Sequence, residues 1–327
     1  MHGCARSSFA TACIATAANK NRQPWHTAMT DLTVKLSHVG KDYPFFSLND
    51  VSLDIPRGSI MGYIGRNGAG KSTTIRIILG LLRQDRGEVE VLGHPMPAEQ
   101  KAAKWDIGFV SEDMRLYANA TLEWHLRFIK SIYPNWDEGH ARKLLKRLDL
   151  NVAQKIDGMS HGQRVKAALL LALARHPRLL LLDEPTTGLD PVARREILAE
   201  IEDVLADGAD RSVLFSSHNT LDVEKISNQV AFIDRGRIIQ CGDKDAFLDR
   251  WRRLRLQVPA GKELPALAGI VDVKRDGLYT IAITNAYRVD LQGAFDAAGV
   301  LLNAVEPLSL EEIFLASVDH NTENSAA

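Results

Sequence analysis

Residues Ile60–Thr73 read IMGYIGRNGAGKST, a short apolar run that leads into glycines and then into Gly-Lys-Ser. The apolar run predicts a buried strand, and the residues from Lys71 to about Leu82 predict a helix. Glycines in such a strand-loop-helix unit let backbone N–H groups turn inward on phosphate oxygens, and the positive end of the helix favours the same anion. We therefore expect a phosphate loop that binds ATP or GTP.

The loop supplies most of the residues that we expect to hold the nucleotide. Lys71 is expected to place a positive charge on the β- and γ-phosphates, and Ser72 to offer a hydroxyl to Mg²⁺. A glycine-rich turn that only starts a helix would need neither side chain. The predicted nucleotide-binding residues of the loop are Gly65, Asn67, Gly68, Ala69, Gly70, Lys71, Ser72 and Thr73.

Apolar periodicity around the loop predicts an α/β core. Alternation over Leu32–Leu36 and Val51–Ile55 indicates antiparallel strands. Buried runs at Leu179–Leu182 and Val213–Ser216, separated by a helical segment, indicate parallel strands joined by a crossover. Residues 115–176 have helical periodicity and predict an inserted helical subdomain.

The 327 residues exceed the usual size of one domain, so we expect one large domain and a smaller appendage. The predicted boundaries are 1–30 for a disordered extension, 31–248 for the ATPase domain, 249–320 for an α+β domain and 321–327 for a disordered tail. Met29 as the true start, or a faint secretory signal, would also account for the first segment. Ser309 and Glu312 are placed as a capping box that starts a terminal helix.

Composition excludes several classes of protein. The formal net charge of −1 shows no basic bias, so we expect no nucleic-acid partner. Three cysteines without metal-ligand spacing predict reduced thiols. The most apolar stretch, Ala167–Leu182, is interrupted by the charged and proline residues 175–178, which argues against a membrane-spanning helix.

Further motifs follow the phosphate loop in a fixed order. They are MSHGQ at Met159–Gln163, LLLLDE at Leu179–Glu184, TGLD at Thr187–Asp190, and His218 after a predicted strand. A strand that ends in two carboxylates could, taken alone, carry ordinary surface charges. The whole ordered set resembles the ATP-binding cassette family, over approximately Leu32–Phe247. The resemblance implies a RecA-like P-loop NTPase core, with the antiparallel β and inserted helical subdomains.

The resemblance also implies roles for individual residues. Lys71, Glu184 and His218 become the catalytic set, with Glu184 as the base and His218 as a switch that contacts the γ-phosphate. Asp183 and Ser72 become magnesium ligands. Ser160, Gly162 and Gln163 become contacts to the ATP of an opposite subunit, and Asp190 becomes a link between subunits. Tyr43 resembles the aromatic residue that stacks on adenine, although Phe45 or Phe46 could replace it.

Two residues depart from the family pattern. Glu112, in FVSED, stands where a glutamine usually contacts Mg²⁺ and senses the permease, and a carboxylate there could still engage the ion. His161 replaces the first glycine of the usual signature pair, so a titratable group near the γ-phosphate or simple tolerance at a loop position would both account for it.

The resemblance implies a head-to-tail dimer, by expectation a homodimer, that sandwiches two ATP molecules and drives separate transmembrane permease subunits. Such a subunit would lie at the cytoplasmic face of the plasma or inner membrane, held there through the permease. The stretches YPNWD at Tyr133–Asp137 and SLEEIFL at Ser309–Leu315 resemble bacterial ABC-2 or exporter-type ATPases. The alternatives are a soluble cassette ATPase in translation or DNA maintenance, and a degenerate regulatory subunit. A single phosphate loop, no extended heptads, and intact Lys71 and Glu184 argue against both.

Overall fold

The computed structural model describes residues 31–326 except 207, 209 and 266. The predicted disordered extension, residues 1–30, lies outside these residues, as do Cys4 and Cys13. Cys241 is partly buried, and burial raises the pKa of its thiol to about 12. Among the residues described, no helix is long and apolar enough to span a bilayer.

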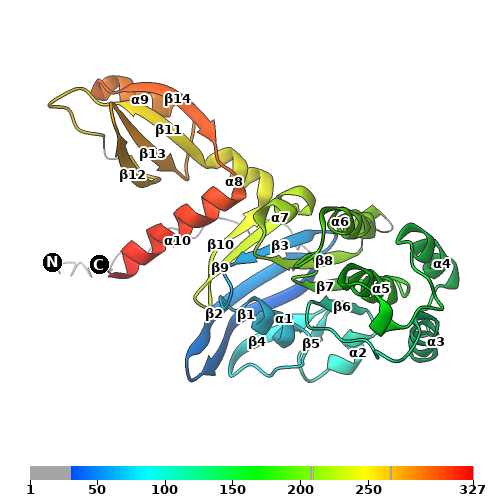
Figure 1. Cartoon of the computed structure of the whole chain (residues 1–327). Coiled ribbons are helices and arrows are strands. Elements are labelled where there is room, and N and C mark those ends of the chain that lie inside the picture. Colours follow the sequence, from blue (N-terminus) through cyan, green and yellow to red (C-terminus); the bar gives the residue numbers. More distant parts are fainter. Residues whose placement is uncertain (1–30, 207, 209, 266, 327) are drawn as a thin grey trace, which may run out of the picture. The chain divides into compact units, whose positions relative to one another are not determined.

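A six-stranded sheet carries the phosphate loop near its centre, in the order β10-β9-β3-β8-β7-β6 (Figure 1). The strand β3 (Ile60–Gly65) is buried along its whole length because it lies between two parallel neighbours and is covered on both faces. Strand β10 pairs antiparallel to β9 at one edge. The remaining strands are β6 (Ile107–Ser111), β7 (Leu179–Asp183), β8 (Ser212–Ser217), β9 (Gln229–Asp234) and β10 (Arg237–Asp243).

An antiparallel sheet in the order β2-β1-β4-β5 forms the second layer. Its strands are β1 (Leu32–Tyr43), β2 (Phe46–Pro56), β4 (Arg86–Val91) and β5 (His94–Pro95). Helix α1 (Lys71–Ile78) contacts β4 of this sheet and β3 and β7 of the larger one, so the loop before it is fixed from both sides. The helix ends at Ile78 rather than near Leu82, because Gly80 adopts a left-handed φ of 64° just after the last turn.

Helices α5, α6 and α7 pack on the part of the large sheet that runs from β3 to β6. Helix α5 contacts β6, whereas α6 and α7 contact β8 (Figure 1). The helical region expected over residues 115–176 contains α3, α4, a 3₁₀ turn and α5. The helices and the turn are α2 (Gln100–Lys104), α3 (Leu122–Ile132), α4 (Glu138–Arg147), η1 (Ile156–Gly158), α5 (His161–Leu173), α6 (Pro191–Ala206) and α7 (Thr220–Ile226).

A third sheet, β12-β13-β11-β14, is formed after residue 251 and has a separate apolar core that includes Leu254 and Phe295. The capping box forms as expected: the Glu312 N–H donates to Ser309 Oγ at 3.3 Å, and the Ser309 N–H to Glu312 Oε2 at 2.9 Å. The elements are α8 (Lys244–Arg250), β11 (Arg252–Gln257), β12 (Ile270–Asp276), β13 (Tyr279–Thr284), α9 (Leu291–Ala298), β14 (Leu301–Pro307) and α10 (Leu310–Ala326).

The backbone of α10 continues to Ala326, which differs from the disordered tail expected from residue 321. No glycine or proline interrupts residues 310–326, so the capped helix has no local reason to end earlier. The predicted α/β class, with an antiparallel sheet and helical insertion, is confirmed.

Candidate ATP site

The phosphate loop between β3 and α1 depends on its glycines. Gly68 and Gly70 have left-handed φ values of 79° and 114°. A Cβ on Gly70 would lie 2.6 Å from Leu48 Cδ2, and one on Gly65 would lie 2.5 Å from the carbonyl oxygen of Ile233. Helix α1 begins after Gly70 with no side-chain cap. Its first N–H groups are therefore suited to an anion, and this fits the expected phosphate.

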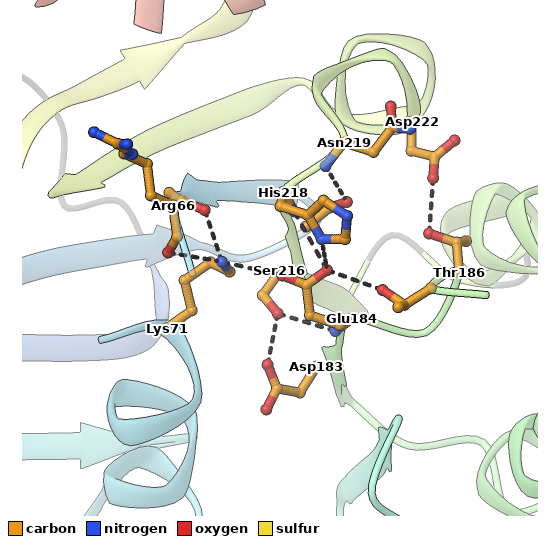
Figure 2. Close-up of polar contacts among 12 residues, drawn as sticks. Arg66, Lys71, Asp183, Glu184, Thr186, Ser216, His218, Asn219 and Asp222 are labelled. Atoms are coloured by element: carbon orange, nitrogen blue, oxygen red, sulfur yellow. Dashed lines mark hydrogen bonds and ion pairs between the residues drawn. The ribbon is translucent and has the colours of Figure 1, made fainter. Parts of the chain in front are cut away.

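Lys71 is held below the surface, with only 6% of its side chain exposed. Its Nζ donates to the carbonyl oxygen of Gly65 at 2.7 Å and to that of Arg66 at 3.3 Å. The same ammonium forms an ion pair with Glu184 Oε1 at 3.0 Å. Figure 2 shows these contacts converging at the start of α1. The structure therefore joins two predicted catalytic residues that are far apart in the sequence.

Glu184 directly follows β7 and adopts a left-handed φ of 53°. Its N–H lies 3.2 Å from the carbonyl oxygen and 3.1 Å from Oγ of Ser216. Its Oε2 accepts hydrogen bonds from Nδ1 of His218 at 2.7 Å, from the His218 N–H at 3.3 Å and from Thr187 Oγ1 at 3.2 Å (Figure 2). Because a carboxylate only accepts, His218 Nδ1 carries the hydrogen.

Asp183, the last residue of β7, is 8% exposed. Its Oδ1 accepts a hydrogen bond from Ser216 Oγ at 2.8 Å, and its carbonyl oxygen accepts one from the Glu112 N–H at 3.1 Å. Ser72 is the second residue of α1, whereas the Glu112 side chain is exposed beyond β6. Ser216 was not predicted as a site residue, although its place opposite Asp183 in the pairing of β7 with β8 orients that carboxylate.

The signature loop lies at the start of α5. Ser160 is the N-cap: its Oγ accepts from the Gln163 N–H at 3.2 Å, and its own N–H donates to Gln163 Oε1 at 2.9 Å. Within the described residues, no hydrogen bond or ion pair joins Ser160 or Gly162 to the phosphate loop. His161 does reach the site, because its Nε2 lies 3.0 Å from the carbonyl oxygen of Thr187.

The aromatic residues stand beside the phosphate loop at the turn between β1 and β2. Tyr43 is 41% exposed, and its ring centroid lies 6.3 Å from that of Phe46. Phe46 packs against the loop itself, since a Cβ on Gly70 would lie 3.0 Å from Phe46 Cζ. Phe45 is fully exposed. Tyr43 is thus partly exposed at this turn, and its stacking on adenine stays a prediction.

Asp190 caps helix α6. Its Oδ1 accepts from the N–H groups of Val192 at 2.9 Å and Ala193 at 3.0 Å. These backbone hydrogen bonds lower the pKa of Asp190, and the one from Ala193 has the largest effect. The Asp190 carboxylate therefore accepts hydrogen bonds from its own chain, and these stabilise the bend between the segment after Glu184 and α6.

A second network, which no sequence pattern indicates, connects the segment after Glu184 to α7. Asp222 is 3% exposed. Thr186 Oγ1 donates to Asp222 Oδ2 at 2.7 Å, and Arg194 Nε donates to Oδ1 at 2.7 Å. Sequence alone could show only an acidic residue four positions after His218, without its partners.

Comparisons with known proteins identify the family of this chain. The family model described as ABC transporter matches residues 48–187. The chain is 29% identical over 276 residues to the ABC transporter ATP-binding protein YtrB of Bacillus subtilis strain 168, which covers 82% of this chain and 92% of YtrB. It is 30% identical over 308 residues to the Nod factor export ATP-binding protein I of Rhizobium meliloti, over 88% of each chain.

A solved structure of the ATP-binding subunit of an ABC transporter matches with a TM-score of 0.61 at 27% identity. The match covers 66% of this chain and 92% of that structure. The predicted P-loop NTPase fold is therefore confirmed. The chain belongs to the ABC transporter family, as an ATP-binding subunit with ATPase activity.

Proposed function

We propose that this chain hydrolyses ATP at the cluster of Lys71, Glu184 and His218 to power a separate transmembrane exporter. The observation that supports this most strongly is the Glu184 carboxylate, which lies between the buried ammonium of Lys71 and the His218 ring. The three residues stand where β3, β7 and β8 end, at one edge of a parallel sheet. Open α/β sheets bind their ligands at this edge.

The residues have complementary tasks in hydrolysis. Lys71 and the first N–H groups of α1 hold the β- and γ-phosphates. Glu184 takes a proton from the attacking water as the water oxygen forms a bond to the γ-phosphorus. The bond between this phosphorus and the bridging oxygen breaks, which releases ADP and phosphate. His218 holds the γ-phosphate. Tyr43 stacks on adenine, with Phe46 behind it.

Magnesium fits the oxygen atoms of this site. Ser72, Asp183 and Glu112 would hold it, since hydroxyl and carboxylate oxygens are its preferred ligands. When bound, it would neutralise charge that develops on the phosphates. Asp183 enters this set through an orientation that Ser216 fixes.

The site is proposed to be completed by a second subunit. Ser160, Gly162 and Gln163 start a helix whose N-terminal end offers N–H groups to a phosphate, yet they make no polar contact with their own phosphate loop within the described part of the chain. A head-to-tail homodimer would place these groups on the partner's ATP. Asp190, which fixes the start of α6, would stand at the interface.

The permease is proposed to dock in an apolar groove beside Glu112. The groove has a volume of about 390 Å³ and is lined mainly by apolar side chains, some of them exposed, together with Lys104, Arg115 and Arg175. Tyr117 is 66% exposed, and Phe128 is 42% exposed and stacks on Trp124. Burying such a side chain contributes about 1.5–3 kcal/mol, so a short amphipathic helix of a permease would gain binding energy here. Docking would hold the chain at the cytoplasmic face of the membrane.

One segment connects the groove to the ATP site, because residues 114–117 line the groove and the Glu112 N–H just before them donates to the Asp183 carbonyl oxygen at 3.1 Å. A structural change at the ATP site on binding or hydrolysis would thus be transmitted to the permease through the backbone hydrogen bond between Glu112 and Asp183. Relatives named for export of Nod factor support an exporter. A soluble role in translation or DNA maintenance has no comparable support.

Affinity capture from native membranes tests the transport role. The tagged full chain should co-purify with an integral membrane protein, and Tyr117→Asp should weaken that capture because it places a charge in the groove. Val289→Asp is the matched control, since Val289 is 83% exposed and does not line the groove. Recovery with ribosomes or DNA alone would reject the proposal.

A further inference from the structure

His161 is the first residue of α5, at the position where it departs from the family's signature pattern. Its Nε2 lies 3.0 Å from the carbonyl oxygen of Thr187. A carbonyl oxygen can only accept, so Nε2 carries the hydrogen. The ring also packs near Gly188, where a Cβ would lie 3.6 Å from Nε2. The side chain therefore bridges the signature loop to the segment after Glu184.

Thr187 in turn forms two hydrogen bonds with Glu184. Its Oγ1 donates to Glu184 Oε2 at 3.2 Å, and its N–H donates to the Glu184 carbonyl oxygen at 3.3 Å. The turn from Glu184 to Thr187 is thus closed by both a side-chain and a backbone hydrogen bond. A displacement of the Thr187 backbone would move the hydroxyl that orients the proposed base.

The hydrogen bond from His161 to Thr187 is not needed to start helix α5. Ser160 and Gln163 already form a reciprocal capping box at that end. A glycine at position 161 would keep this capping box but would have no donor for Thr187. The histidine therefore adds one specific contact, directed at the Glu184 segment.

We propose that His161 is a positioning residue that links the two ATP sites of the dimer through Thr187 to Glu184. This inference rests on the proposed function, in which Ser160 binds the partner's ATP while Glu184 acts on the chain's own. Binding of the partner's nucleotide fixes the start of α5, and His161 transmits that position to Thr187. Glu184 then reaches its working orientation.

Steady-state ATP hydrolysis by the full chain tests the link. His161→Ala should lower kcat on the order of 2- to 10-fold, the size expected for one hydrogen bond, with little change in KM. His161→Gln should restore most of the loss, because its amide keeps an N–H donor within similar reach. Thr187→Val should lower kcat as well, and the double variant should lose no more than the larger single loss.

The Hill coefficient for ATP measures the coupling between sites. It should exceed 1 in the wild type and fall toward 1 in His161→Ala. His94→Ala is the control, since His94 contacts Glu99 on the surface of the antiparallel sheet. An unchanged kcat in His161→Ala, no rescue by glutamine, or additive losses with Thr187→Val would overturn the positioning role. A Hill coefficient that does not change would overturn the coupling.

If the proposed function itself is wrong, the experiments give results that differ from those of a failed coupling. Sedimentation of Glu184→Gln with ATP should show a dimer, and a monomer there would reject the shared sites and, with them, the coupling. The kcat series would still decide whether His161 positions Glu184 within one chain. Absence of hydrolysis by the wild type would reject the enzyme itself.

Discussion

Replacing Glu184 by glutamine should uncouple ATP binding from turnover. The substitution keeps the size of the side chain and an oxygen that can accept from Thr187 and His218, but it removes the negative charge. Loss of a general base typically lowers a rate by about 10²–10⁴-fold. We therefore expect almost no hydrolysis by Glu184→Gln.

The same substitution should strengthen ATP binding. Lys71 is 6% exposed and is paired with Glu184 Oε1 at 3.0 Å, so the phosphates of ATP must share or displace that ion pair. A hydrogen bond to a charged group contributes about 1.5–3 kcal/mol net, which corresponds to an affinity gain on the order of 10- to 100-fold when the competing carboxylate is removed. The gain should be greatest at low ionic strength.

Equilibrium titration with a non-hydrolysable ATP analogue separates affinity from turnover, and release of phosphate measures the rate. Protein concentration is kept low so that dimerisation does not add to the affinity. Glu88→Gln removes an equal charge from the exposed surface of β4 and serves as the control. Normal hydrolysis by Glu184→Gln would refute Glu184 as the base. Weaker binding than the wild type would refute the competition for Lys71.

Two further predictions concern the surroundings of the site. Asp222→Ala should lower the free energy of unfolding by about 1–3 kcal/mol, because Thr186 and Arg194 lose their acceptor, and denaturant unfolding should show a smaller loss for Asp222→Asn. Asp137 caps α4, and its hydrogen bond from His176 lowers the pKa of that carboxyl to about 2. A lowered folded pKa gives a stabilising contribution that is complete above the unfolded value near 3.8 and is lost as pH falls toward 2. Asp137→Asn keeps the cap, so the wild type should be the more stable at pH 6, and the difference measured by unfolding should shrink below pH 4.

Local patterns predicted the central elements of this fold. The run Ile60–Ile64, followed by glycines and Lys71, defines strand, loop and helix within 20 residues, because each part depends on its own sequence. The end of α1 was misplaced because apolar periodicity continues beyond Gly80, whereas the backbone of that glycine turns left-handed. Strand positions were predictable, but the order of the strands depends on packing between distant segments.

The candidate site was predictable in its residue types and less so in its contacts. The sequence motifs identified Lys71, Glu184 and His218 as candidates. Only the fold shows that the Glu184 carboxylate contacts both of the other side chains. The contact from His161 to Thr187 spans 26 residues, and no periodicity predicts it. Asp222 was missed for the same reason, since an acidic side chain on a helix is usually solvated and this one is buried.

Ser216 contacts both carboxyl-bearing residues at the end of β7, Asp183 and Glu184. A left-handed φ at a glutamate costs about 1–3 kcal/mol, so Glu184 requires compensating contacts. Ser216 supplies them: its carbonyl oxygen and hydroxyl both lie within reach of the Glu184 N–H, and the same hydroxyl donates to Asp183. Since β8 carries this serine and ends just before His218, one strand orients the proposed base, the proposed magnesium ligand and the proposed switch. The motif LLLLDE thus provides the two carboxylates, and the neighbouring strand determines what each can reach.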